Sequence, residues 1–396
     1  MPERRTILIH VSGIDRPGIT SGLLSILADQ EARVLDMEQF VVMGRLTLDV
    51  VVSIDEERAA FRDLLFFGWE QGIEIEFEET SPPTAELPSL RRHAVTVIAS
   101  HLPPVALAAI AEAIAGAGGN IERIRRLAND PVASYELIVA GADDQDLRRR
   151  LGAAAMDHGI DVAVQPEALE RRAKRLVVID VDSTLIRDEV IDLLAEEAGK
   201  ADEVTELTRR AMIGELDFSA ALQQRVALLE GLDADAIERV VDRLRLTPGA
   251  RRFVRTLRRL GFSTAIVSGG FRRITDTLRE RLGFDHAFAN ELEIVDGRLT
   301  GRLCGEVVDR RRKAELLIHV AEMENVPLEQ TVAIGDGAND LDMLAAAGLG
   351  IAFNAKRSVT EVADTAVSVP YLDAILFLLG IGADEIERDR PTGAGS

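Results

Sequence analysis

The nine residues VVIDVDSTL, at positions 177–185, decide how the fold of this chain is interpreted. The apolar run 177–179 is typical of a buried strand, yet two aspartates, Asp180 and Asp182, follow it directly. Two carboxylates this close repel each other, and each raises the proton affinity of the other unless a cation lies between them. The stretch therefore predicts a strand that ends in a site containing positive charge.

The composition of the chain narrows the classes of protein to which it can belong. Its 396 residues are enough for two or three domains, and 47% of them are hydrophobic, so sizeable cores can form. The formal net charge of −21 disfavours binding to nucleic acid or anionic lipid, and an aromatic content of 4% is too low for base stacking. An anionic substrate must therefore be attracted locally, by a few cations or by a metal ion.

The single cysteine and the apolar runs bear on the compartment of the protein. Cys304 alone cannot form an intramolecular disulfide, which suits a reducing cytosol, and we expect it to be a small buried residue rather than a nucleophile. The sequence opens without a charged and then apolar leader, and the longest apolar run, AILFLLGIG at 374–382, is too short to span a bilayer. We therefore expect a cytoplasmic protein.

The first part of the chain repeats one order of elements. Residues 1–80 and residues 93–168 each show the pattern strand, helix, strand, strand, helix, strand. Between them, residues 81–92 are rich in proline, serine and charge, which is typical of a linker. We predict two copies of a ferredoxin-like βαββαβ domain.

Residues 174–380 show a different pattern, in which strands alternate with helices as in a parallel sheet. Residues 190–246 follow the first strand directly and are helical in period, so they predict a helical cap, while Asp296-Gly297 predicts a hairpin. We expect residues 384–396 to form a disordered tail. The predicted fold class is α/β, a Rossmann-like parallel sheet with a cap insertion, preceded by the two βαββαβ domains.

Three polar turns follow strands of the predicted sheet: residues 180–184 (DVDST), 268–270 (SGG) and 335–340 (GDGAND). In such a sheet ligands bind outside the carboxyl ends of the strands, so the three turns should face one crevice, joined by Lys313 from the helix before the third strand. Each turn by itself is also explained by helix capping or ordinary turn formation. Together they predict a site.

The acids of these turns suit a hard divalent cation. Asp180, Asp182 and Asp336 would repel one another, and Mg²⁺ with oxygen ligands would relieve this repulsion and neutralise charge on a bound phosphate. The sequence therefore predicts a magnesium site at this edge of the sheet.

The same turns supply the groups that phosphoryl transfer needs. Asp180 can attack phosphorus and form an aspartyl-phosphate, while Asp182 can protonate the leaving oxygen and later deprotonate water. Ser268, the amide of Gly269 and the ammonium of Lys313 would hold the phosphoryl oxygens. The paired acids are thus predicted to be a nucleophile and a proton carrier.

The third domain resembles the haloacid dehalogenase superfamily of aspartate-nucleophile phosphatases, through DVDSTLIRDEVIDLLAEEAG, VSGGF and AIGDGANDLDML. The resemblance is greatest to its members that act on phosphoserine. It implies that Mg²⁺ is held by the side chain of Asp180, the backbone carbonyl of Asp182 and Asp336. It also implies that Asn339 and Asp340 support the phosphate and the metal.

The resemblance further implies which residues hold the substrate. Glu189 would bind its ammonium and Arg225 its carboxylate, while Met212 and Phe218 would line the cap. Taken alone, Arg225 could be a solvated helical arginine and Glu189 a first-turn acid stabilised by the helix dipole. The implied reaction is the hydrolysis of O-phospho-L-serine to L-serine, the last step of serine biosynthesis. Phosphothreonine, a protein phosphosite or another small phosphate ester is the alternative substrate.

The two amino-terminal domains resemble ACT domains, which often bind amino acids. The resemblance is carried by GIDRPG at 13–18, where Asp15 and Gly18 could hold a ligand at a helix start. The alternative is an ordinary helix start with Asp15 as the cap. The second copy has SHLPP at 100–104 and lacks this pattern. The resemblance implies feedback by serine and a homodimer, and an amino-acid sensor with an inactive third domain is the alternative function.

Overall fold

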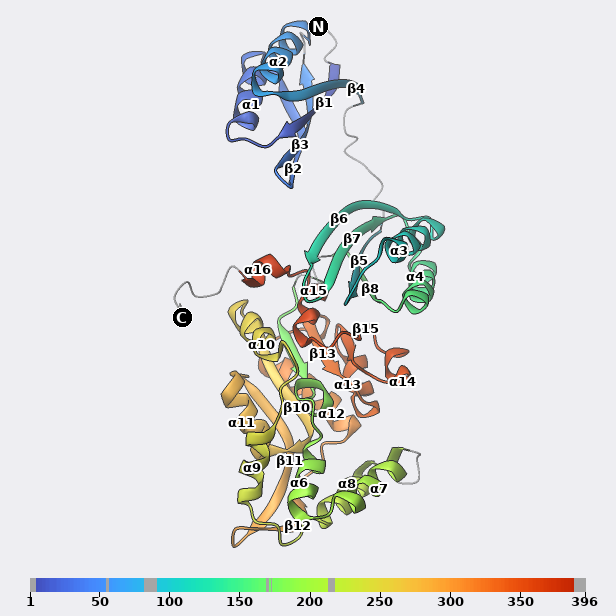
Figure 1. Ribbon diagram of the computed structural model, residues 1–396, viewed down its shortest axis with the longest axis vertical. Coiled ribbons are helices and arrows are strands. Elements are labelled where there is room, and N and C mark those ends of the chain that lie inside the picture. The colour runs from blue at the N-terminus through green and yellow to red at the C-terminus, as the bar shows by residue number, and fades with distance from the viewer. Residues whose placement is uncertain are drawn as a thin grey trace. The chain divides into compact units, whose positions relative to one another are not determined.

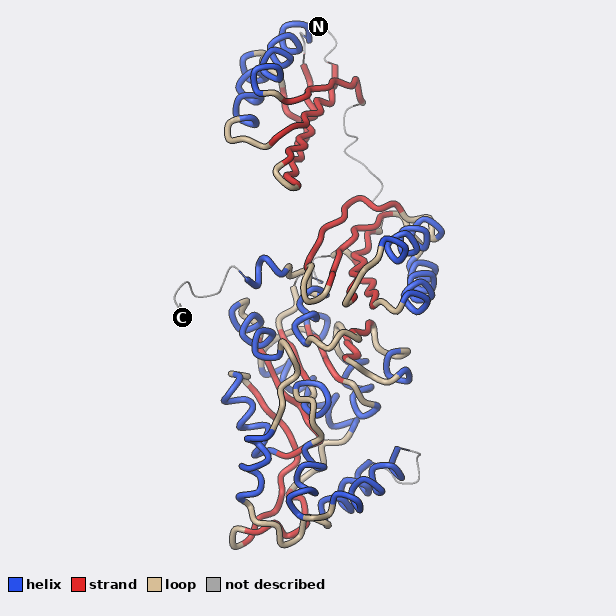
Figure 2. The backbone as a smooth tube through the Cα atoms, viewed as in Figure 1, coloured by secondary structure: helices blue, strands red, loops and turns tan. Residues whose placement is uncertain are grey.

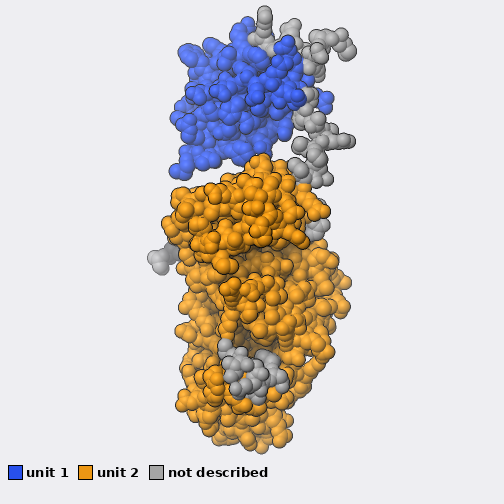
Figure 3. Space-filling model, turned by 90° about the vertical axis from the view of Figure 1, so that its right-hand side faces the viewer, with its two compact units in different colours: residues 1–89 blue, residues 90–396 orange. Residues whose placement is uncertain are grey.

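The computed structural model describes residues 5–54, 57–81, 91–168, 171, 173–212 and 218–387. The chain divides into two compact units, residues 1–89 and 90–396 (Figure 3). Each unit is described by itself. The side chains of Met212 and Phe218, which were expected to line the cap, lie outside the described residues.

The first unit contains the first repeat domain, with its six elements in the predicted order. They are β1 (Arg5–Ile14), α1 (Ile19–Asp29), β2 (Arg33–Val42), β3 (Arg45–Ile54), α2 (Glu57–Gln71) and β4 (Ile73–Thr80). The strands form an antiparallel sheet in the order β2-β3-β1-β4, with both helices on one face (Figure 2). Every second residue of β1 points into this core, where Ile9 and Val11 lie with Leu23 of α1.

The start of α1 differs from the simplest interpretation of its sequence. Gly18, with a φ of 102°, is the residue that caps the helix, and as a glycine it has no side chain that could accept a hydrogen bond. Asp15 is exposed and lies in the preceding loop, where its amide donates to the carbonyl of Gly44 at 2.9 Å. The alternative in which Asp15 caps this helix is therefore wrong, because the left-handed turn at Gly18 places the helix start three residues later.

The second unit begins with the second repeat domain. Its elements are β5 (Arg92–Ala99), α3 (Pro104–Gly116), β6 (Asn120–Ala128), β7 (Ala133–Ala140), α4 (Asp144–His158) and β8 (Asp161–Pro166). The sheet order β6-β7-β5-β8 repeats that of the first domain strand for strand, and the helices again cover one face. The predicted repeat of ferredoxin-like domains is confirmed.

The rest of the second unit is built on a seven-stranded sheet in the order β12-β11-β10-β9-β13-β14-β15 (Figure 1). Its strands are β9 (Leu176–Ile179), β10 (Ser263–Phe271), β11 (His286–Val295), β12 (Arg298–Cys304), β13 (Thr331–Gly335), β14 (Gly350–Phe353) and β15 (Thr365–Val367). All neighbouring strands are parallel except β11 and β12. β9 is central and apolar throughout because it is buried on both faces: Val177 and Ile179 lie in one core, Leu176 and Val178 in another.

Helices surround this sheet and form the cap. Between β9 and β10 lie α6 (Val190–Ala198), α7 (Ala201–Met212), α8 (Phe218–Ala227) and α9 (Asp235–Arg243), so the predicted helical insertion is confirmed. The remaining helices are α10 (Ala250–Arg259), α11 (Arg272–Leu282), α12 (Arg310–Met323), α13 (Leu341–Ala346), α14 (Arg357–Thr360), α15 (Ile375–Leu378) and α16 (Ala383–Glu387). No helix in the described part of the chain is long and apolar enough to cross a membrane.

Two local expectations are corrected and one is confirmed. Asp296 and Gly297, with φ angles of 51° and 76°, make the predicted tight turn between β11 and β12. Cys304 is exposed rather than buried, because it ends the edge strand β12. The expected disorder from residue 384 is wrong for residues 384–387, which belong to α16. Ile386 of this helix is buried in the core.

The second repeat domain packs directly on the sheet domain. Ile98 and Ala163, on the sheet face that α3 and α4 leave open, join one hydrophobic core with residues 374–379. Two polar contacts accompany this packing: Arg171 pairs with Glu136 at 2.5 Å, with both side chains buried, and Gln165 donates to the carbonyl of Leu378 at 3.0 Å. The second repeat domain and the sheet domain therefore share one core.

Candidate active site

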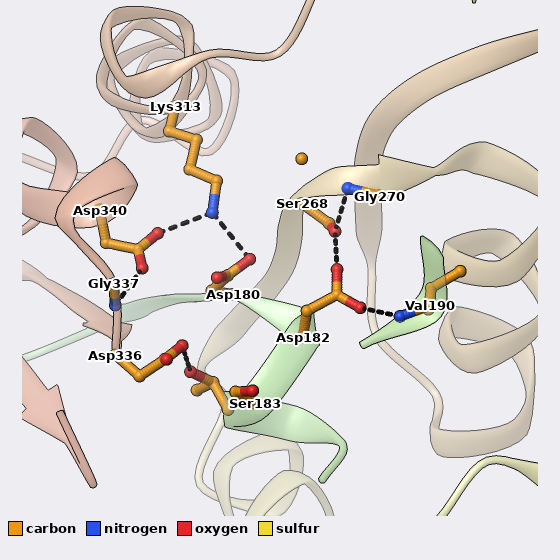
Figure 4. Close-up of polar contacts among 12 residues, drawn as sticks. Asp180, Asp182, Ser183, Val190, Ser268, Gly270, Lys313, Asp336, Gly337 and Asp340 are labelled. Carbon is orange, nitrogen blue, oxygen red and sulfur yellow. Dashed lines mark hydrogen bonds and ion pairs between the residues drawn. The ribbon is translucent and has the colours of Figure 1, made fainter. Parts of the chain in front are cut away.

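Three neighbouring strands bring the predicted residues to one edge of the sheet. Asp180 follows β9, Asp336 follows β13, and Ser268 lies near the end of β10, while the sheet order places β9 between the other two. Because the strands are parallel, their carboxyl ends meet at the same edge (Figure 4). The three turns that the sequence singled out therefore converge as predicted.

Lys313 of α12 connects two of the acids. Its ammonium lies 2.8 Å from a carboxylate oxygen of Asp180 and 2.7 Å from one of Asp340, and the lysine is completely buried. Burial lowers the pKa of Lys313, but the two carboxylates raise it by more, so its pKa lies above the ordinary value and it is a permanent cation. The second oxygen of Asp340 accepts from the amide of Gly337 at 3.0 Å, which fixes the turn after β13.

The carboxylates of Asp180, Asp336 and Asp340 form a cluster in which one oxygen of each lies within 4.8 Å of the others. Burial, followed by the charge of Asp340, raises the pKa of Asp180 well above its ordinary value and that of Asp336 to about 6. Three carboxylates against the one ammonium of Lys313 leave two negative charges uncompensated. An all-oxygen donor set with excess negative charge fits a hard divalent cation.

The carboxylate of Asp182 lies apart from this cluster, on the side facing β10 and the cap (Figure 4). One of its oxygens accepts from the amide of Val190 at 2.8 Å, and the other from the hydroxyl of Ser268 at 3.3 Å. Burial and, after it, the charge of Glu189 raise the pKa of Asp182 to about 7. A carboxyl group with this pKa can carry a proton near neutral pH.

A cavity of about 590 Å³ opens in front of these acids, between the sheet edge and the cap. Asp180, Asp182 and Asp336 line its sheet side together with Gly269 and Asn339, and Glu189 and Arg225 line its cap side. Gly269 and Asn339, predicted to bind the phosphate, therefore share one cavity with Glu189 and Arg225, whereas Ser268 is not part of its lining. Lys313 is not at its surface, since it lies buried behind Asp180 and Asp340.

Contacts with neighbouring hydroxyl groups position the cap-side residues. The hydroxyl of Ser183 donates to Glu189 at 2.7 Å, and Ser183 has a φ of 56°, a left-handed conformation that is uncommon for a residue other than glycine. Arg225 lies 3.5 Å from the hydroxyl of Thr208, and burial lowers the pKa of its guanidinium. The charged ends of both side chains are held near the cavity.

Several residues of the site were missed by the sequence reasoning. Ser183 and Thr184 lie inside the opening motif but were assigned to helix capping, whereas the hydroxyl of Thr184 donates to Asp336 at 2.9 Å. Thr208 and Lys356 also line the cavity or contact its lining, and no motif in the sequence marks them. Arg310, three residues before Lys313, lines the cavity as well.

Comparison with known proteins agrees with this geometry. A phosphoserine phosphatase of Streptomyces coelicolor is 52% identical over 385 residues, covering 96% of this chain and 94% of the relative. The chain belongs to the phosphoserine phosphatase family. The phosphoserine phosphatase SerB2 of Mycobacterium tuberculosis is 47% identical over 396 residues, covering 98% of this chain and 96% of the relative.

Family models match the three domains separately, and a solved structure matches most of the chain. The haloacid dehalogenase-like hydrolase model matches residues 177–345, and ACT domain models match residues 5–78 and 91–165. The unliganded crystal structure of a probable phosphoserine phosphatase from Vibrio cholerae matches with a TM-score of 0.58 and 34% identity, covering 75% of this chain and 89% of that one. The predicted superfamily, the ACT domains and phosphatase activity are confirmed, and the alternative of an inactive third domain is set aside.

Proposed function

We propose that this phosphatase hydrolyses O-phospho-L-serine to L-serine and inorganic phosphate, as its relatives' names state for them, and so completes serine biosynthesis in the cytoplasm. The observation that supports this substrate is the cavity with two differently charged sides. Carboxylates that would hold a divalent cation and the backbone of Gly269 lie on the sheet side, and an acid and an arginine, Glu189 and Arg225, lie on the cap side. A free phosphoamino acid carries a phosphate, an ammonium and a carboxylate, which match these groups.

In the proposed reaction Asp180 attacks phosphorus. One of its oxygens is held by Lys313 at 2.8 Å, so the carboxylate is oriented before the substrate arrives. The new bond joins an oxygen of Asp180 to phosphorus while the bond from phosphorus to the serine oxygen breaks, which gives an aspartyl-phosphate. Lys313, Ser268 and the amide of Gly269 stabilise the phosphoryl oxygens as charge shifts.

Asp182 carries the proton in both halves of the reaction. It protonates the serine oxygen as that oxygen leaves, and it then removes a proton from the water that attacks the aspartyl-phosphate. This attack breaks the bond between phosphorus and the oxygen of Asp180, so phosphate leaves and the carboxylate of Asp180 is regenerated. Its hydrogen bonds to Val190 and Ser268 direct it toward the cap side of the cavity, away from Lys313 (Figure 4). Two adjacent acids can therefore have different roles, because one faces the buried lysine and the other faces the leaving group.

Magnesium, when bound, would neutralise charge on the phosphoryl group and on the acid cluster. Asp180, Asp336 and the backbone carbonyl of Asp182 would hold it, as the resemblance to the haloacid dehalogenase superfamily implies. Asp340 joins the same cluster but already pairs with Lys313 and with the amide of Gly337. We therefore assign Asp340 to holding the lysine and the turn, and Asn339, at the cavity wall, to the phosphate.

The cap residues select the amino-acid part of the substrate. Glu189, held by Ser183, binds the ammonium, and Arg225 binds the carboxylate. In a phosphopeptide both groups are tied up in amide bonds, so a free phosphoamino acid is favoured over a protein phosphosite. Met212 and Phe218 complete the proposed lining of the cap.

Regulation and assembly are proposed from the ACT domains. Serine would act as a feedback effector at the first repeat domain, where Gly18 caps α1 and Asp15 lies in the loop before it. We further propose that the chain works as a homodimer, because ACT domains often assemble.

A phosphate-release assay tests the substrate and the metal together. Phosphoserine, phosphothreonine and a phosphoserine peptide are compared with and without a chelator, and we expect rapid release from phosphoserine alone and only without chelator. Asp180→Asn should abolish turnover while thermal unfolding stays close to wild type. Arg225→Gln should raise KM for phosphoserine more than it lowers kcat. Equal rates on the peptide and on the free amino acid would reject the roles of Glu189 and Arg225.

A further inference from the structure

A second cavity in the same unit lies behind the catalytic turn, and its chemistry differs from that of the active site. It has a volume of about 520 Å³, within the range of sites for small molecules. Its lining consists of residues 246–252, Arg255, Tyr371 and Ile386. We call it the arginine cavity, because three of these residues are arginines.

The charge of the arginine cavity is opposite to that of the chain. Among the described residues, Arg251, Arg252 and Arg255 line it and no aspartate or glutamate does, although the chain has a formal net charge of −21. Arg252 pairs with Asp373. Arg251 and Arg255 make no ion pair within the described part of the chain, and as positions i and i+4 of α10 they lie on the same face of the helix. Two guanidinium groups are therefore available to one ligand.

Two adjacent guanidinium groups recognise an oxyanion, because each can donate two parallel hydrogen bonds to a phosphate or a carboxylate. We propose that the arginine cavity is a second binding site, separate from the active site, for a small molecule that carries a phosphate or carboxylate group. The positive cluster attracts such a ligand against the field of an acidic protein.

The position of the cavity connects this site to catalysis. The hydroxyl of Thr247, in its wall, donates to the carbonyl of Thr184 at 2.7 Å, and the hydroxyl of Thr184 donates to Asp336 at 2.9 Å. Two hydrogen bonds thus lead from the cavity wall to the acid cluster. On the other side of the cavity, the amide of Leu372 donates to the carbonyl of Pro248 at 2.8 Å. An anion held there changes turnover without competing with the substrate.

The first test counts bound anions, with inorganic phosphate as the probe. Equilibrium dialysis of the full chain is carried out with wild type, with Arg251→Gln/Arg255→Gln, and with the control Arg258→Gln/Arg259→Gln. The control removes the same two charges from the same helix at positions that do not line the cavity. We expect the first variant to bind one phosphate fewer per chain than wild type, and the control to match wild type. Loss of a charge-assisted contact should weaken that site about tenfold for each arginine.

The number of phosphates bound per chain also distinguishes this proposal from the proposed function. Phosphate that binds in the active site as the product remains bound in the Arg251→Gln/Arg255→Gln variant. The difference in bound phosphate between this variant and wild type therefore does not depend on whether phosphoserine is the substrate. An unchanged count in that variant, or an equal loss in the control, overturns the second site.

The second test concerns turnover and the class of ligand. Phosphate inhibition of wild type should contain a component that changes kcat as well as KM, and this component should disappear in the Arg251→Gln/Arg255→Gln variant. Thr247→Val should keep the bound phosphate but lose the change in kcat. Dialysis with citrate shows whether the site also accepts carboxylates. If citrate displaces the second phosphate, both anions bind in the arginine cavity. If citrate does not displace it, the site is specific for phosphates. Purely competitive inhibition in wild type overturns the link to catalysis.

Discussion

The two repeat domains have the same order of strands and helices, yet their second sheet faces differ. In β5 of the second domain seven of eight residues are buried, because one face packs on α3 and α4 and the other on the sheet domain. In β1 of the first domain buried residues alternate with half-buried ones, since only one face has a core within its unit. One fold thus serves either as a separate module or as a part of the enzyme.

The difference follows from the side chains of that second face. In the first domain it carries His10 and Asp49, 2.6 Å apart, beside Glu74, Glu76 and Glu78 of β4. In the second domain the face carries Ile98 and Ala163 instead. An apolar face must be covered, whereas an acidic face can stay in water. The comparison predicts that changes on this face affect the second domain far more than the first.

Truncation should have the largest effect. A chain that starts at residue 91 keeps the whole second unit, so we expect it to fold and to retain phosphatase turnover. A chain that starts at residue 174 exposes the apolar segment 374–379, so we expect aggregation or loss of the cooperative unfolding transition. Expression, light scattering and calorimetry of both chains check this. A stable, active chain starting at 174 would show that the second repeat domain is dispensable.

The second largest effect should come from substituting the acids on the two faces, which should reduce stability by different amounts. Glu136→Ala removes the nearer acidic partner of the buried guanidinium of Arg171 and leaves it only the 3.5 Å contact with Glu167, which should cost about 3 kcal/mol of the free energy of unfolding. Asp49→Ala, in the first domain, removes a part-exposed partner of His10 and should cost less than about 1 kcal/mol. Urea unfolding of both variants gives the two values, and equal costs would contradict the comparison.

Apolar residues on the two faces give a third contrast. Ile98→Ala opens a cavity in the core shared with the sheet domain, and it should destabilise the second unit by about 2–5 kcal/mol. Leu8→Ala, on the second face of β1, removes a half-buried side chain and should cost clearly less. Thermal unfolding followed by circular dichroism compares them, with Ile98→Val as the variant that should recover most of the stability.

The smallest expected effect concerns the proposed regulation by serine. Only the first domain has the GIDRPG loop, so Asp15→Ala should shift the serine concentration for half-inhibition, while His101→Ala in the second domain should leave it unchanged. Steady-state assays with L-serine at fixed phosphoserine measure both. If the two variants and wild type respond alike, serine acts only as a product in the active site.

Some residues of the active site could be predicted from the local sequence, and others could not. The three turns at the strand ends were identified correctly because the carboxyl ends of neighbouring parallel strands must meet. The resemblance implied that Asp340 supports the phosphate and the metal, but the sequence did not indicate that its carboxylate pairs with Lys313, or that the carboxylate of Asp182 turns toward Ser268. These choices depend on hydrogen bonds formed across strands. Lys356 and Thr208 have no local pattern at all, since they reach the cavity from distant elements.

The sequence by itself determined the repeated βαββαβ domains, the parallel sheet, the cap insertion and the reactive turns, because strand and helix periods and turn residues act over a few positions. The tertiary structure alone decided that the second repeat domain shares a core with the sheet domain and that α16 packs Ile386 there. It also left Cys304 exposed on an edge strand and placed Tyr371 and Ile386 beside the arginines of α10 at one cavity. These outcomes depend on which distant surfaces meet, and burial and pairing between distant residues are not encoded in any short stretch.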